Sequence, residues 1–128
     1  MSYLLSDLAN QLKTAGKITN IGTDCFYDIW PDIKNCYMLE ETDTIETLAD
    51  TIFKRNIKIW YRNINHATAK ANLLSIQSYL KLPSDGGTIL INNRTALIKI
   101  ITHTRFMFQL RDCFYFLLEL CITTGIDN

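Results

Sequence analysis

A change of hydrophobic period inside the stretch 56–83 is the feature that most constrains how this chain can fold. In its first part, Ile57, Ile59 and Tyr61 occur at every second position. This period is typical of a strand that buries one face of a sheet and only partly covers the other. The residues that alternate with them are Lys58, Trp60 and Arg62.

The second part of the same stretch has helical spacing instead. Its apolar positions, which recur every three or four residues, are Ala69, Leu73, Ile76 and Leu80. Asn63 or Asn65 can cap the first free amides of this helix, because a short polar side chain accepts hydrogen bonds there. Pro83 is expected to end it, since proline has no amide donor and clashes with the preceding turn. The stretch therefore predicts a strand followed by a helix.

The residues before this unit predict a helix and two strands. Residues 2–15 carry a leucine stripe, and Gly16 can adopt the left-handed conformation that ends helices. The runs 25–30 and 35–40 are aromatic or apolar and are separated by Pro31 and Asp32, a pattern that predicts a hairpin.

The residues after it predict three further strands. The β-branched runs 88–91 and 95–102 flank Asn92 and Asn93, which tolerate positive φ, so we expect a second hairpin. Residues 112–124 form a long final strand. The prediction is one α+β domain over residues 1–128, with a mixed, mainly antiparallel sheet of five to six strands flanked by two main helices in the order α-β-β-β-α-β-β-β.

The acidic segment 40–50 concentrates negative charge in few residues, which favours exposure to solvent. Apolar residues between positions 45 and 53 keep helical spacing, so a short helix is expected, although a loop that docks on a partner would show the same pattern. We consider the segment a candidate for an interface or a channel wall, and a plain solvated loop is the alternative. Its acidic residues are Glu40, Glu41, Asp43, Glu46 and Asp50.

Nothing in the sequence has the spacing of a catalytic or metal site. The four cysteines are dispersed among apolar runs, and neither His66 nor His103 has a second ligand nearby, so we expect no disulfide, no metal and no cofactor. Residues 85–87 precede a strand, so they indicate a turn and not a phosphate loop. Without a convergent set of polar groups, the sequence indicates no enzyme.

Charge and hydropathy narrow the choice of partners. Thirteen basic and thirteen acidic residues cancel, so no overall field attracts the chain to nucleic acid or to a membrane. The basic and aromatic residues between positions 54 and 62 could form a platform for single-stranded nucleic acid, but a half-exposed strand explains them better. No run is long enough for a membrane span, and without a secretion signal we expect a cytoplasmic protein.

Three sequence segments carry a resemblance to a known family. They are RNIKIWYRN at 55–63, HATAKANLLSIQSYL at 66–80 and TILINNRTALIKI at 88–100. Together they resemble the tail terminator proteins of long-tailed bacteriophages, often labelled minor capsid proteins. The chain departs from the family at TRFMFQLRD, residues 104–112, where only Arg105 and Asp112 match the usual pattern.

The resemblance implies a structural role and no enzymatic activity. Such proteins form a hexameric ring on the head-proximal end of the tail tube, stop its growth and provide the surface that joins the head. It implies as partners further copies of this chain, the tail tube protein and the head-tail connector (neck) protein, with DNA passing through the ring without specific binding. The chain would be in the host cytoplasm during assembly and then in the tail or neck of the virion. The alternative is a monomeric, non-enzymatic module that binds another protein in the cytoplasm.

The final strand is the candidate subunit contact. We expect it to lie at an edge of the sheet, where unpaired backbone groups favour association with another chain. Its second face is too apolar for a monomer to leave exposed, and we expect neighbouring subunits to cover it. The residues of this candidate contact are Tyr115, Leu117 and Cys121.

Overall fold

The computed structural model describes residues 4–49, 52–84, 89–91 and 94–125, and it has the α+β fold and the element order that the sequence predicts. Two helices accompany a six-stranded mixed sheet. The elements are α1 (Leu4–Thr14), β1 (Cys25–Tyr27), β2 (Cys36–Ala49), β3 (Ile52–Asn63), α2 (His66–Ser84), β4 (Ile89–Ile91), β5 (Arg94–Leu110) and β6 (Cys113–Gly125).

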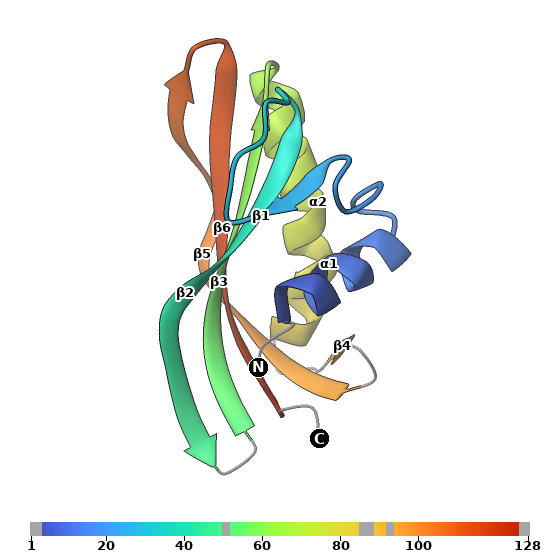
Figure 1. Ribbon diagram of the computed structural model, residues 1–128, viewed down its shortest axis with the longest axis vertical. Coiled ribbons are helices and arrows are strands. Elements are labelled where there is room, and N and C mark those ends of the chain that lie inside the picture. The colour runs from blue at the N-terminus through green and yellow to red at the C-terminus, as the bar shows by residue number, and fades with distance from the viewer. Residues whose placement is uncertain (1–3, 50–51, 85–88, 92–93, 126–128) are drawn as a thin grey trace.

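The strands lie in the order β1-β2-β3-β6-β5-β4. All neighbouring strands are antiparallel except β1 and β2, which are parallel. Both helices lie against the same face of the sheet, and the far end of the β2–β3 hairpin extends beyond them (Figure 1). We call the side under the helices the covered face and the other side the open face.

The hydrophobic core lies between the covered face and the helices. Leu39, Ile59 and Leu118 form one cross-strand row of β2, β3 and β6, and all three are fully buried. The alternation of Ile57, Ile59 and Tyr61 is confirmed, since all three side chains belong to this core. The helices contribute their predicted stripes, namely Leu4, Leu8, Leu12, Ala69, Leu73, Ile76 and Leu80.

The start of α2 and the end of α1 are formed by residues that the sequence predicts. The Asn65 side chain accepts a 2.9 Å hydrogen bond from the amide of Thr68, and the Asn63 side chain accepts one of 2.9 Å from the amide of Asn65. Gly16 follows α1 with a φ of 76°, as expected for the residue that ends a helix. The expectation that Pro83 stops α2 is off by one residue, since the helix ends at Ser84. Near a C-terminus, a missing amide donor affects only the last turn.

The predicted hairpin of residues 25–40 is wrong. β1 and β2 pair in parallel, with Cys25 opposite Tyr37 and Tyr27 opposite Leu39. The connection 28–35 does not turn tightly at Pro31, because it has to return the chain to the end of the sheet where β1 began. Asp28, which has a φ of 62°, starts that return and donates its amide to the carbonyl of Leu39 at 2.9 Å.

The predicted helix within residues 45–53 is also wrong, because residues 45–49 belong to β2 and residues 52–53 to β3, while 50–51 lie outside the described residues. Ile45 pairs with Arg55 and Thr47 with Phe53, and β2 changes register between Glu41 and Ile45 and again between Thr47 and Ala49. Such irregularities spoil the two-residue period that identifies a strand, so the spacing resembled a helix by coincidence. Pairing with β3 decides the conformation.

The hairpin predicted after α2 is confirmed as β4 and β5, but β5 continues to Leu110. A turn at Arg111, with a φ of 57°, leads into β6. The expectation that the final strand lies at an edge is wrong, because β6 sits between β3 and β5. The long strand β5 pairs with β6 along its outer side, so β6 has a neighbour on both sides. No local pattern in residues 112–124 indicates this.

Candidate interaction surface

The open face carries charged side chains in its middle and aromatic side chains at one end. Glu40 lies opposite Lys58, and Lys58 lies opposite Glu119 on the next strand. Opposite charges therefore alternate across β2, β3 and β6, an arrangement that stabilises neighbouring strands. The balance of charge also argues against a nucleic-acid platform on this face, which would need an excess of cations.

Two carboxylates of the acidic segment are held by β3. Glu40 accepts a 3.0 Å hydrogen bond from Nε1 of Trp60, and Glu41 lies 3.5 Å from the guanidinium of Arg55. The side chains of Glu41 and Arg55 are only 18% and 11% exposed. The expectation of a freely solvated segment is therefore wrong for its first two residues. Asp43 and Glu46 lie on β2, and Asp50 lies outside the described residues.

Arg62 organises the aromatic end of the open face. Its guanidinium donates hydrogen bonds to the carbonyl of Pro31, to the carbonyl of Ile33 at 2.7 and 3.0 Å, and to the hydroxyl of Tyr115 at 2.9 Å. It also lies 4.6 Å from the ring centre of Trp30, within the range of a cation–π interaction. One side chain of β3 thus holds the connection 28–35 down on the open face.

The residues expected to contact another subunit are already buried in a single chain. Tyr115, Leu117 and Cys121 are 6%, 6% and 4% exposed in a single chain, so the expectation of a wet apolar face on β6 is wrong. The ring of Tyr115 packs edge-on against Trp30 at 5.1 Å and stacks on Phe108 at 4.6 Å. The contact with Trp30 comes from a segment distant in sequence, which explains why the sequence did not reveal it.

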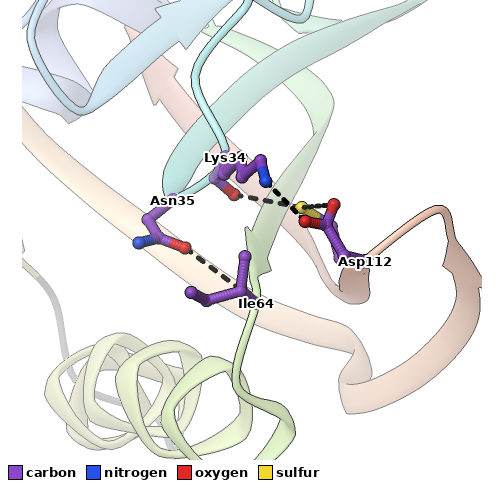
Figure 2. Close-up of polar contacts among 5 residues, drawn as sticks. Lys34, Asn35, Ile64 and Asp112 are labelled. Carbon is purple, nitrogen blue, oxygen red and sulfur yellow. Dashed lines mark hydrogen bonds and ion pairs between the residues drawn. The ribbon is translucent and has the colours of Figure 1, made fainter.

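Three connections meet at the end of the sheet where β2 begins (Figure 2). Lys34 forms an ion pair with Asp112 of the β5–β6 turn, and the side chain of Asn35 accepts a 3.1 Å hydrogen bond from the amide of Ile64. The thiol of Cys113 lies 3.5 Å from the carbonyl of Lys34. The connections 28–35, 64–65 and 111–112 are thereby fixed to one another.

Large apolar side chains near these three connections remain exposed to solvent. Ile29 is 76% exposed, and Ile64 and Leu110 are 51% and 55% exposed. We call the whole set the apolar end; it comprises Ile29, Ile33, Ile64, Phe106, Phe108 and Leu110. Exposed apolar side chains that gather in one region mark a surface that binds another molecule. Sequence reasoning missed this end because its members come from three separate segments.

The remaining candidate groups have structural roles in the part of the chain that is described. His66, at the start of α2, packs among Phe106, Phe114 and Phe116 at 5.0 to 5.5 Å between ring centres. His103 is exposed on β5. The described residues contain no group of three or more His, Cys, Asp or Glu placed to hold a metal ion. Residues 85–88 are not among them.

The four cysteines are buried. Cys25, Cys36, Cys113 and Cys121 are each at most 6% exposed, and none of them forms a disulfide. Burial, followed by the nearby charge of Asp24, raises the pKa of Cys25 to about 12. A thiol with this pKa stays protonated at neutral pH and is a poor nucleophile.

The chain was compared with protein families and with curated proteins. Neither a scan against models of protein families nor a search of curated proteins found a match for this chain. Among the helices of the described residues, none is long and apolar enough to cross a membrane.

Proposed function

We propose that this protein is a structural component of a bacteriophage virion and not an enzyme. In this proposal it forms a ring at the head-proximal end of the tail tube, ends tail growth and presents the surface to which the head joins. The observation that carries the proposal is the apolar end, with six large side chains that are 40% to 76% exposed. Such a surface is suited to burial against another protein.

The segments that resemble tail terminator proteins support the same role. They form β3, α2 and the β4–β5 hairpin, which pack on one another around Ile59, Leu73 and Ile98. The resemblance therefore coincides with the central unit of the fold. Its partners in this proposal are further copies of the chain, the tail tube protein and the neck protein, and DNA crosses the ring without being recognised.

Virions of the phage that encodes this chain provide the test. Quantitative mass spectrometry should find about six copies per particle, since a closed ring needs one copy per symmetry-related position. Immuno-electron microscopy should place them at the junction of head and tail. Loss of the gene should give overlong tails that do not join heads.

The apolar end would also suit a module that binds its partner as a monomer. Absence of the protein from virions, together with normal tails when its gene is removed, would overturn the structural proposal and favour that alternative. A copy number incompatible with a six-fold ring would overturn the ring alone.

A further inference from the structure

The sheet has a long unpaired edge on each side. β1 pairs only with residues 37–39 of β2, and β4 pairs only with residues 94–96 of β5. Among the described residues, no strand lies beyond Glu40–Ala49 of β2 or beyond Leu97–Leu110 of β5. Unpaired strand edges of this length are ready to accept a strand of another chain.

The two edges carry opposite charge. β2 contains Glu40, Glu41, Asp43 and Glu46 and has no lysine, arginine or histidine. β5 has no acidic residue. Its basic residues are Arg94, Lys99, His103 and Arg105. Because the whole chain has thirteen residues of each sign, this separation is a property of the two edge strands and not of the composition. Complementary charge steers association and selects the partner edge.

The two edges also lie at the same position along the strand direction. Cross-strand pairs link Glu41 through Ile57 and Leu120 to Ile100. A second row links Glu46 through Lys54 and Thr123 to Leu97. The acidic segment of β2 and the start of the free edge of β5 therefore lie at the same level on opposite sides.

Strand direction is compatible with pairing between copies. Three successive antiparallel pairings connect β2 to β5, so these two strands run in opposite directions. Rotation about an axis that lies along the strands preserves direction, so β5 of one copy would meet β2 of the next as an antiparallel neighbour. Each copy would use both edges, which is the heterologous contact that closes rings.

Only the first part of the β5 edge is regular enough for this contact. Beyond Ile100 the strand shifts register three times against β6, and the amide of Thr104 donates to the side chain of Gln77 at 2.7 Å. Bulges of this kind protect edges from unwanted pairing. Residues 97–100 precede the shifts and Ile101 lies in the first of them; Leu97 and Ile101 are 50% and 46% exposed.

From these observations we propose that the acidic edge of β2 in one copy pairs with the basic edge of β5 in the next copy. The sheet then continues from subunit to subunit, and residues 97–101 are the centre of the contact. This inference rests on the proposed ring, and it assigns the acidic segment to the interface between copies and not to the channel wall.

A charge exchange between the edges tests this proposal. One variant carries Lys99→Glu, the basic residue within 97–101, and a second carries Asp43→Lys with Glu46→Lys. Each variant alone brings like charges together, and we expect ring formation to fall at least about tenfold, because like charges at a contact oppose association. An equal mixture should restore rings, since alternating copies then place opposite charges at every interface and six positions accommodate the alternation.

Assembly is measured by electron microscopy and native mass spectrometry, with the protein alone and on purified tail tubes. Lys70→Glu, at an exposed position of α2, is the matched control and should assemble like the wild type. Circular dichroism melts establish that each variant folds; should the double variant not fold, the single change Glu46→Lys replaces it.

Two results would overturn the edge contact. The first is normal assembly of folded variants taken singly. The second is a mixture that assembles no better than its components. A wild type that never self-associates in either format would reject the contact as well. Six copies at the head-tail junction together with a failed exchange would leave the proposed function standing and reject only this contact. If the variants assemble as the charge exchange predicts but the protein is absent from virions, the edge contact stands and the proposed function is rejected.

Discussion

The two faces of the sheet are stabilised in different ways. On the covered face, aliphatic side chains from α1, α2 and four central strands bury one another completely, and polar side chains have little part. On the open face, one arginine holds a connection of eight residues, 28–35, over a small group of aromatic rings. The covered face depends on many interchangeable apolar contacts, whereas the open face depends on a few specific ones. Substitutions on the two faces should therefore differ in both size and kind.

Truncation of the helix stripe should have the largest effect. Leu73→Ala or Ile76→Ala leaves a cavity under α2, where both side chains are fully buried, and should lower the free energy of unfolding by about 2–5 kcal/mol. Urea denaturation followed by circular dichroism measures the loss. Lys70→Ala, on the exposed side of the same helix, is the control. If both core variants unfolded at the wild-type urea concentration, the covered face would not be the main core.

Loss of the arginine should come next. Arg62→Met removes the hydrogen bonds to Ile33 and Tyr115 and should cost about 1.5–3 kcal/mol, the range for hydrogen bonds to a charged group. Arg62→Lys keeps the charge but not the fork of donors, so it should recover only part of the loss. Hydrogen exchange should increase in residues 28–35 while α2 stays protected. Equal loss of protection in both regions would mean that the two faces are not independent.

A smaller effect is expected at Trp60. Trp60→Phe keeps an aromatic ring but loses the hydrogen bond from Nε1 to Glu40, which should cost about 0.5–1.5 kcal/mol. Glu40→Gln retains an acceptor and is the matched control. Thermal melts of both variants, followed by circular dichroism, give the comparison. A larger loss from Glu40→Gln than from Trp60→Phe would show that Glu40 acts through a different partner.

The exposed ion pair should matter least. The hydrogen bond between Lys34 and Asp112 lowers the pKa of Asp112 and raises the pKa of Lys34. Stability from the lowered pKa is present above the unfolded-state value of Asp112 and is lost as pH falls through the folded-state value. Because both side chains are more than half exposed, Asp112→Asn should change the melting temperature little at neutral pH and not at all in strong acid. A large decrease at neutral pH would contradict this.

The same contrast explains which parts of the fold the sequence predicted. The alternation of Ile57, Ile59 and Tyr61, the stripe from Ala69 to Leu80 and the cap at Asn65 all concern neighbours within one or two turns or along one strand. Each of these expectations is confirmed. Local spacing is sufficient where an element buries one face against a large core, because the burial itself imposes the period.

Expectations that depended on distant pairing failed. The parallel arrangement of β1 and β2 and the strand conformation near Ile45 both depend on which strand lies alongside. The burial of Tyr115 depends on Trp30, 85 positions earlier in the chain, and on Arg62 of a third strand. Hydrogen bonds between strands and contacts across a sheet connect residues whose separation in sequence leaves no periodic signal.

By itself, the sequence determined the class of the fold, the order of its elements, the residues of the covered face and the absence of net charge. Only the tertiary structure decided that β6 is central, that Arg62 secures a loop over Tyr115, and that an acidic and a basic strand form the two free edges. The physical reason is that apolar burial acts on each element separately, while strand order and edge exposure are properties of the whole sheet. Which strand has an unpaired edge depends on how all the other strands pair.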